Sequence, residues 1–367
     1  MMLAQAENTA TGATAPEKAV VAGTAAPEKA AASGGTADLL TRADVLRRIP
    51  EGSLAFFTLA NSAYGDLAIN WALLLLPVLE PLGAADHVFI GALDAKIAAQ
   101  LLARRLPTIR AGLNGTDDDA ADAPDGNFRL VFSKFRAYGV TKADLIAWLL
   151  RHRRDVVVSD VDCAWLAPPH YLLKELPEAD VMAGTDCLHV TSDDDRSPRR
   201  HAEPRCGHHP GSMWAAWFNT GVLVFRATPA AIDFAERWRR AMAAVHGDGT
   251  FGNQVDDQLT FNQLVEWNGT IGDRAHGYLY PVRAARGRPD GRVILDASGR
   301  VQLAALPART VCSGHVFHIQ QGIERRDCIV MHLTFVEADR AGKRWRLREA
   351  GLFPVRQLLF ESAVHPV

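Results

Sequence analysis

Short apolar runs alternate with amphipathic or polar segments along most of the chain. Residues 54–59, 87–94 and 156–158 are rich in β-branched, aromatic and aliphatic residues, which predicts buried strands. Between them, residues 70–76 and 142–152 have the composition of helices. Strands that alternate with helices in this way predict an α/β domain with a mostly parallel sheet.

The second half of the chain continues this alternation. Residues 180–186 and 217–225 predict two further strands, and residues 328–332 predict a short one. A helix is expected after Thr228-Pro229, because a threonine cap followed by proline is typical of a helix start. Another helix is expected over residues 256–267. Ligands of such sheets lie beyond the carboxyl ends of the strands.

The first part of the chain has a different character. Residues 1–40 consist mainly of Ala, Thr, Gly, Pro, Glu and Lys, and the pentapeptide Ala-Pro-Glu-Lys-Ala occurs at Ala15 and again at Ala26. This segment has too little apolar bulk to offset the entropy of ordering, so we expect a disordered tail. Residues 41–367 are expected to form a single domain.

Composition excludes some classes of function. The 367 residues are 48% hydrophobic and 22% charged, as in ordinary globular enzymes. A net charge of −2 argues against a nucleic-acid partner. The longest apolar run, residues 71–76, meets Pro77 and is too short to cross a bilayer. The N-terminus lacks the basic and apolar regions of a signal peptide, so we expect no membrane segment in this chain.

The five cysteines form no CxxC pair, which argues against a zinc ribbon or a thioredoxin-like motif. One or two disulfides are compatible with their number, but the spacing does not assign pairs. Cys206, His208 and His209 lack a second ligand pair, so zinc is disfavoured there. Residues 247–252 fit G-x-G-x-x-G but follow a helix instead of a strand, which predicts an ordinary loop.

The strongest chemical signal is Asp160-Val161-Asp162, directly after the strand at residues 156–158. In extended geometry both carboxylates leave from the same side. Two carboxylates at a strand end form half of a cage for a hard divalent cation such as Mg²⁺ or Mn²⁺. A helix cap with a surface turn is the alternative, but buried carboxylates without a partner are costly. The pair therefore indicates an enzyme whose metal holds the diphosphate of an activated substrate.

Three further features are ambiguous on pattern alone. Haloacid-dehalogenase-type phosphatases also place DxD after a strand, but Ala164 stands where they have Thr or Val. His332 ends a predicted strand, where a lone histidine is more often structural than a metal ligand. Asp256, Asp257 and Gln258 open a predicted helix, where they either cap the helix or face the reacting group.

Several ordered blocks of the sequence carry a family resemblance. They are residues 57–64 with 70–71, 158–166, 218–228, 257–262, 312–315, 332–335 and 342–350. Through these blocks the chain resembles nucleotide-diphospho-sugar transferases, in particular the plant and algal extensin (hydroxyproline-rich glycoprotein) arabinosyltransferases. The resemblance implies a GT-A-type fold, with a mixed, mostly parallel central sheet flanked by helices. Residues 41–170 would form a Rossmann-like nucleotide-binding half, and residues 171–367 an acceptor half.

The resemblance also implies a reaction. It is a metal-dependent, retaining transfer of a sugar, arabinose first, from a UDP-sugar to a cell-wall hydroxyproline-rich glycoprotein or glycan in the Golgi lumen. Xylosyl or galactosyl transfer, or a non-catalytic nucleotide-sugar or glycan-binding protein, are the alternatives. The implied Mn²⁺ (or Mg²⁺) ligands are Asp160, Asp162 and His332. The implied nucleotide and diphosphate contacts are Thr58, Asn61, Lys142, Asp160 and Thr220, and the implied catalytic residues are Asn219, Asp257 and Gln258.

Overall fold

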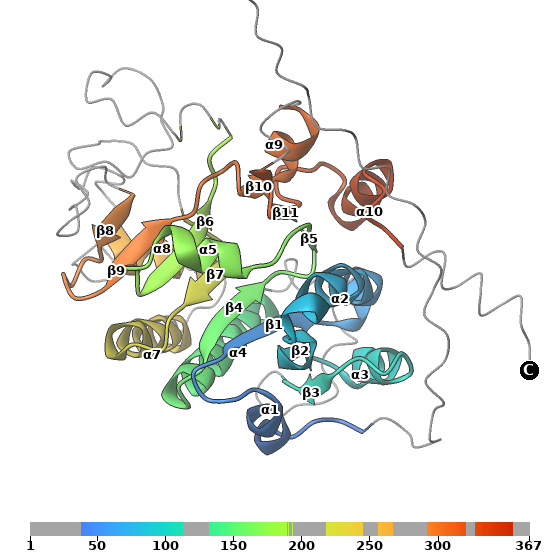
Figure 1. The fold of residues 1–367 in the computed structure, drawn as a ribbon, viewed down its shortest axis with the longest axis horizontal. Helices are drawn as coiled ribbons and strands as arrows, with labels where there is room; N and C mark the ends of the chain where they lie inside the picture. Colours follow the sequence, from blue (N-terminus) through green and yellow to red (C-terminus); the bar gives the residue numbers. More distant parts are fainter. Residues whose placement is uncertain are drawn as a thin grey trace, which may run out of the picture. The chain divides into compact units, whose positions relative to one another are not determined.

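The structure is a computed structural model that describes residues 38–112, 132–188, 190, 193, 218–244, 256–266, 292–320 and 327–354. Residues 37–367 form one compact unit (Figure 1). The predicted tail up to residue 37, the candidate zinc cluster around Cys206 and the G-x-G-x-x-G segment lie outside the described residues. Leu40, the last residue of the predicted tail, forms a β-bridge with Ile109.

The centre of the unit is an eight-stranded mixed sheet with the order β3-β2-β1-β4-β7-β6-β9-β8. Its strands are β1 (Leu54–Ala60), β2 (Val88–Ala92), β3 (Thr108–Arg110), β4 (Asp155–Ser159), β6 (Val181–Thr185), β7 (Phe218–Phe225), β8 (Val293–Leu295) and β9 (Gln302–Ala305). The pairs β2–β3, β1–β2, β1–β4 and β6–β9 are parallel, whereas β7 runs antiparallel to both neighbours. The predicted α/β class with a mostly parallel, Rossmann-like first half is confirmed.

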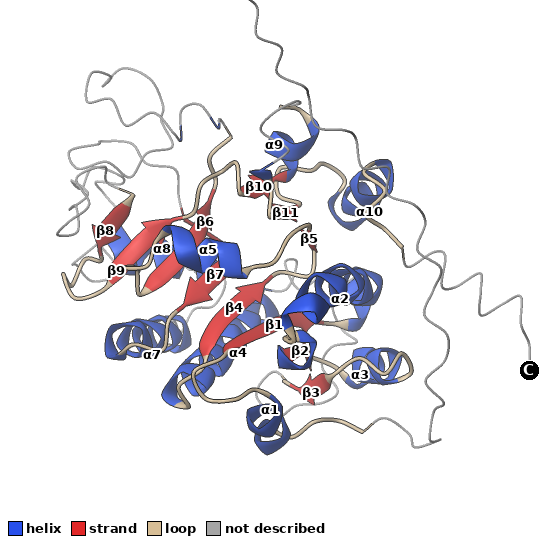
Figure 2. Ribbon diagram, viewed as in Figure 1, coloured by secondary structure: helices blue, strands red, loops and turns tan. Residues whose placement is uncertain are grey.

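Helices cover both faces of this sheet (Figure 2). They are α1 (Arg42–Arg48), α2 (Gly65–Leu79), α3 (Ala95–Leu102), α4 (Phe132–Arg151), α5 (His170–Glu175), α7 (Pro229–Ala243) and α8 (Asp257–Glu266). Alternate side chains of a strand face opposite layers. Phe57 and Val158 belong to one apolar cluster with α4, α7 and α8, while Phe56 and Val157 belong to another with α2, α3 and α5.

A second sheet has three strands, two of which come from the later part of the chain. It has the order β10-β11-β5 and consists of β5 (Cys163–Trp165), β10 (Val311–Ser313) and β11 (Val330–His332). Helices α9 (Gly314–His318) and α10 (Asp339–Glu349) accompany it. A disulfide joins Cys312 of β10 to Cys328, which precedes β11. The strand that ends at His332 is thus held covalently to its neighbour.

Helix α2 is longer than expected at both ends. The predicted helix at residues 70–76 is part of α2, which continues through Pro77 to Leu79. Pro77 lies in the last turn, where one missing backbone donor is offset by burial of Leu75 and Leu79 against the sheet. Residues 62–82 are apolar and long enough to cross a membrane by length and composition, and half of the tested window is buried inside the protein.

Candidate active site

A cavity of about 680 Å³ opens at the carboxyl ends of β1 and β4. Its wall also includes the first residues of β7, the first turn of α8, the end of β11 and part of α10. Because β7 is antiparallel to β4, its amino end lies at the same edge of the sheet as the carboxyl end of β4. The cavity is therefore at the place expected for ligands of an open α/β sheet.

Asp160 and Asp162 lie in a turn, so the predicted extended geometry of this pair is wrong. The turn closes where the Cys163 N–H donates to the Asp160 carbonyl oxygen at 3.1 Å, and the Asp160 N–H donates to the Gly221 carbonyl oxygen at 2.8 Å. The turn still places both carboxylates close to the imidazole of His332. The Nε2 atom of His332 lies 3.5 Å from Asp162 Oδ1 and 3.8 Å from Asp160 Oδ2.

His332 reaches this turn from the small sheet, and Gly221 makes room for it. Residue 332 ends β11 and pairs with Cys163 on β5. A Cβ atom placed on Gly221 would lie 2.0 Å from Cε1 of His332, a distance that no real side chain tolerates. The imidazole therefore packs directly on the backbone of β7, and only glycine permits that approach.

Lys142 of α4 supports the site from beneath the cavity wall. Its Nζ atom lies 3.2 Å from Asp160 Oδ1 and 3.3 Å from Asp257 Oδ2, and it donates to the Thr220 carbonyl oxygen at 2.7 Å. An ammonium group has three donors, so these three oxygens use all of them. Lys142 is 1% exposed and does not line the cavity, so the structure does not bring it to the place of a diphosphate.

Two residues around the carboxylates were not predicted as site residues. Lys343 of α10 lies with Nζ 2.6 Å from Asp162 Oδ2, and Tyr138 of α4 donates from its hydroxyl to Asp160 Oδ1 at 3.0 Å. Tyr138 precedes Lys142 by four residues, a spacing that puts both side chains on one face of a helix. This spacing could have indicated that Tyr138 lies near the site. Lys343 stands inside the block at residues 342–350, but nothing in its local pattern indicates a carboxylate partner.

The ion pairs change the pKa values of both carboxyl groups. Burial acts to raise the pKa of Asp160, but Lys142 more than compensates and the pKa is lowered. Burial also acts to raise the pKa of Asp162, but Lys343 and His332 hold this pKa far below its usual value. Both groups are therefore carboxylates at neutral pH, as metal ligands must be.

We expect this stabilisation to be lost in acid. A carboxyl group whose pKa is lower in the folded than in the unfolded protein stabilises the fold fully above the unfolded pKa, and the effect disappears as pH falls towards the folded pKa. In the presence of EDTA, the free energy of unfolding should decrease from about pH 5 to about pH 3 more steeply in the unmodified protein than in Asp162→Asn. Urea unfolding across this range measures it, and equal slopes would contradict the assignment.

The charges around the cavity favour a divalent cation. Five described residues of its wall are aspartates: Asp160, Asp162, Asp186, Asp256 and Asp257. Among the described residues, only Lys343 in the wall and Lys142 beneath it offset them with lysine charges. A diphosphate would be repelled by this excess unless a cation came between. Two carboxylates that each lie within 3.8 Å of one imidazole nitrogen offer oxygen and nitrogen ligands that suit Mn²⁺ or Mg²⁺.

The opposite side of the cavity holds the three predicted catalytic residues and one that was not predicted. Asp186, just beyond β6, accepts hydrogen bonds at 2.8 Å from the side-chain amides of both Asn219 and Gln258. Asp257 Oδ2 accepts from the Thr220 hydroxyl at 3.0 Å and faces Lys142. Asp186 ends a predicted strand as Asp160 does, and this parallel was the signal that could have found it.

The two predicted residues from the first strand occupy different environments. Asn61 lines the cavity beyond the end of β1. Thr58 is fully buried inside β1, and its hydroxyl has no hydrogen-bond partner among the described residues. The structure therefore brings Asn61, Asp160, Asp162, Asn219, Thr220, Asp257, Gln258 and His332 to one cavity, and leaves Thr58 and Lys142 behind its wall.

Comparison with known proteins identifies relatives. Residues 83–347 match the family described as nucleotide-diphospho-sugar transferase. The chain is 26% identical to "Arabinosyltransferase XEG113" of Arabidopsis thaliana over 302 aligned residues. The alignment covers 81% of this chain and 39% of that protein. The chain thus spans about two fifths of the length of this curated relative.

Solved structures with a related chain path are also found. Mouse xyloside xylosyltransferase 1 is 14% identical with a TM-score of 0.34, and covers 77% of this chain and 98% of its own. A glycosyltransferase involved in glycosylation of the major capsid of PBCV-1 is 10% identical with a TM-score of 0.40, and the match covers 81% of this chain and 99% of that chain. The galactosyltransferase LgtC is 10% identical with a TM-score of 0.37, and covers 81% and 95%.

Proposed function

The chain belongs to the nucleotide-diphospho-sugar transferase family, and on that premise we propose that it is a metal-dependent, retaining glycosyltransferase of the GT-A type. We propose a UDP-sugar as donor, with arabinose as the first candidate sugar because of the Arabidopsis relative. The proposed acceptor is a hydroxyproline-rich glycoprotein or glycan of the cell wall.

One observation carries this proposal. Asp160 and Asp162 lie in the turn between the two sheets, and His332 Nε2, at the end of β11, lies 3.8 Å from the first carboxylate and 3.5 Å from the second at the wall of an acidic cavity. Lys142 and Lys343 offset only part of the charge of the five aspartates in the wall, and a divalent cation would offset more of it. A cation held there gives a diphosphate an anchor next to Lys343, which a purely structural cluster would not need.

The site residues fall into two groups in this proposal. Asp160, Asp162 and His332 hold the metal, and Lys343 stands beside it to meet the diphosphate. A bound Mn²⁺ or Mg²⁺ supplies Lewis-acid stabilisation of the charge that builds up on departing UDP. Lys142 keeps Asp160 and Asp257 in place by its three bonds, so we propose that it positions the carboxylates and does not touch the phosphates. Asn61 and Thr220 are the proposed nucleotide contacts in the wall.

The sugar would lie against the group around Asp186. Because Asp186 binds the NH₂ ends of Asn219 and Gln258, their oxygens turn towards backbone donors of β7. Asn219 Oδ1 accepts from the Gly221 N–H at 2.9 Å, and Gln258 Oε1 lies 3.4 Å from the Thr220 nitrogen. Oxygens fixed in this way can steady an oxocarbenium-like state without reorganising.

The proposal includes a location in the Golgi lumen. It is supported by the resemblance to the plant arabinosyltransferase and by the Cys312–Cys328 disulfide, since disulfides persist mainly in oxidising compartments. The metal bound by these carboxylates would contact the diphosphate, which all of these donors share, and not the sugar. Xylosyl and galactosyl transfer are therefore alternative activities of the same site.

A panel of donors tests the proposal directly. Release of UDP from UDP-arabinose, UDP-xylose and UDP-galactose is measured with Mn²⁺, with and without hydroxyproline-rich peptides or glycan acceptors. One donor should turn over, and EDTA should stop it. Turnover with no donor, together with tight UDP-sugar binding, would instead indicate a non-catalytic binding protein.

Phe335 supports an acceptor site at the mouth of the cavity. This residue lines the cavity, remains 53% exposed and has a φ of 55°, which is strained for a bulky side chain. Strain of this kind persists mainly where a function requires it. A flat apolar face there suits a pyrrolidine ring or the carbon face of a sugar.

We therefore expect Phe335→Ala to raise the KM for the acceptor about tenfold, the equivalent of a lost contact of about 1.4 kcal/mol. The KM for the donor should change little, because the metal and diphosphate contacts lie deeper. Trp345→Ala is the matched control, since Trp345 is 61% exposed on α10 and does not line the cavity. An unchanged acceptor KM in Phe335→Ala would contradict the acceptor site.

A further inference from the structure

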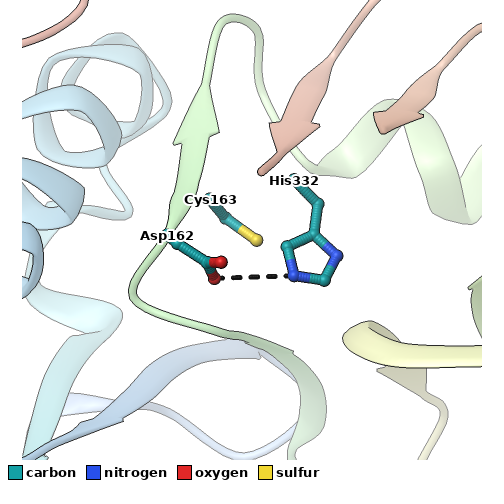
Figure 3. A group of neighbouring side chains, drawn as sticks. All are labelled: Asp162, Cys163 and His332. Atoms are coloured by element: carbon teal, nitrogen blue, oxygen red, sulfur yellow. Dashed lines mark ion pairs between the residues drawn. The ribbon is translucent and has the colours of Figure 1, made fainter. Parts of the chain in front are cut away.

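A free thiol lies behind the metal wall. Cys163 begins β5 and stands opposite His332 in the antiparallel pairing of β5 with β11. It is 1% exposed and is the free cysteine among the described residues. Figure 3 shows its Sγ atom directed towards the imidazole of His332, with the carboxylate of Asp162 beside both. One ligand atom from each of these three side chains lies within 4.8 Å of the others.

The spacing of the three groups is close to that of a tetrahedral metal site. Zinc-type bonds of about 2.0 Å to nitrogen and about 2.3 Å to sulfur put tetrahedral ligand atoms about 3.5 Å apart. His332 Nε2 and Asp162 Oδ1 already lie 3.5 Å apart. The Cys163 Sγ atom lies within 4.8 Å of both other ligand atoms, and a rotation about χ1 can adjust its distance to a shared ion.

The thiol forms a hydrogen bond with the side chain of Ser159. Its only described hydrogen bond to the backbone is a weak one to the Gly221 carbonyl oxygen, at 3.5 Å. Cysteine is a soft ligand that adds little for Mn²⁺ or Mg²⁺ but strongly favours Zn²⁺ and Cd²⁺.

We propose that Cys163 is a conditional metal ligand, which gives the site a second binding mode for thiophilic divalent ions. In this mode Asp162, Cys163 and His332 bind Zn²⁺, Cd²⁺ or Co²⁺ through oxygen, sulfur and nitrogen. The thiol proton is replaced by the metal and leaves to solvent. Mn²⁺ and Mg²⁺ use Asp160, Asp162 and His332 instead, so the two modes share two ligands and exclude each other. Thiophilic ions should therefore displace Mn²⁺.

The inference rests on the metal site of the proposed function, but its test requires neither donor nor acceptor. Purified full-length protein, reduced gently and freed of metal with EDTA, is titrated with Co²⁺ under nitrogen. A sulfur ligand to Co²⁺ produces a near-ultraviolet charge-transfer band, whereas oxygen and nitrogen ligands alone give only the weaker visible bands. The same titration is made with Cys163→Ser and Cys163→Ala, and circular dichroism confirms their fold.

The unmodified protein should show the charge-transfer band, and both variants should lack it while keeping the visible bands. Their Kd for Cd²⁺ should rise at least about tenfold, since even an outer-shell change has that effect. Their Kd for Mn²⁺, followed by electron paramagnetic resonance, should change less than about threefold.

Two results would overturn the inference: visible bands without a charge-transfer band in the unmodified protein, or the same band in the variants. Visible bands alone would leave the oxygen–nitrogen metal site of the proposed function intact. Failure of Co²⁺, Cd²⁺ and Mn²⁺ to bind at all would remove that site together with the inference.

Discussion

Asp162→Asn is expected to reduce sugar transfer by about three orders of magnitude, while the protein stays folded. The change removes a charged metal ligand and leaves the buried ammonium of Lys343 without the carboxylate that lies 2.6 Å away. Metal-ion catalysis contributes several kcal/mol, and each 1.36 kcal/mol is a factor of ten in rate. Loss of about 4 kcal/mol of stabilisation therefore gives the expected decrease.

The measurement is UDP release and sugar transfer with Mn²⁺ at saturating donor. Asp144→Asn is the matched control, because Asp144 lies on α4, is partly exposed and pairs only with Arg42 at the surface. That variant should retain activity within a factor of about two, as surface ion pairs contribute little. If Asp162→Asn kept more than a tenth of the unmodified rate, the metal would have to lie elsewhere.

Lys142→Met should have the largest effect on stability. Lys142 holds the buried carboxylate of Asp257 at 3.3 Å and the partly exposed carboxylate of Asp160 at 3.2 Å, and methionine fills similar space without charge. Removal of one partner of a buried ion pair costs about 3–5 kcal/mol, because the remaining charge is uncompensated. We expect a decrease of this size in the free energy of unfolding, measured by urea denaturation with EDTA present.

A double variant separates the lost pairing from simple mispacking. Asp257→Asn removes one of the two stranded charges, so Lys142→Met/Asp257→Asn should be less destabilised than the sum of the single changes. Lys174→Met, at an exposed position on α5, should be close to neutral. Strict additivity in the double variant would show that Lys142 does not stabilise these carboxylates as a pair.

The strands of the large sheet are readable from the sequence because they are buried on both faces. The runs at residues 54–59, 156–158 and 217–225 are mostly apolar, and the described part of each lies in a strand. Helix boundaries are less readable. α4 begins at Phe132, ten residues before the predicted start, because its first half packs Phe135 and Tyr138 beside the sheet despite a mixed local pattern.

In the site, too, residues that are neighbours in the sequence could be predicted, whereas contacts between distant residues could not. Asp160 and Asp162 stand out because a strand and two carboxylates are neighbours in the sequence. Their partners Lys142 and Lys343 lie far away along the chain, and no local pattern of a buried lysine reveals which carboxylate it will meet. Cys163 looks like an ordinary apolar strand residue, and only its register opposite His332 on β11 reveals its place beside the proposed metal ligands.

The division of the site between two sheets sets the order in which it can be completed. Asp160, Val161 and Asp162 carry the chain from β4 of the large sheet to β5 of the small one. All eight strands of the large sheet have been synthesised once β9 ends at Ala305, whereas His332 and Lys343 come later. Because a chain emerges from its N-terminus, the ribosome delivers a folded core before it delivers the last ligand. The nascent enzyme therefore lacks two residues of its candidate site until the chain has been made beyond Lys343.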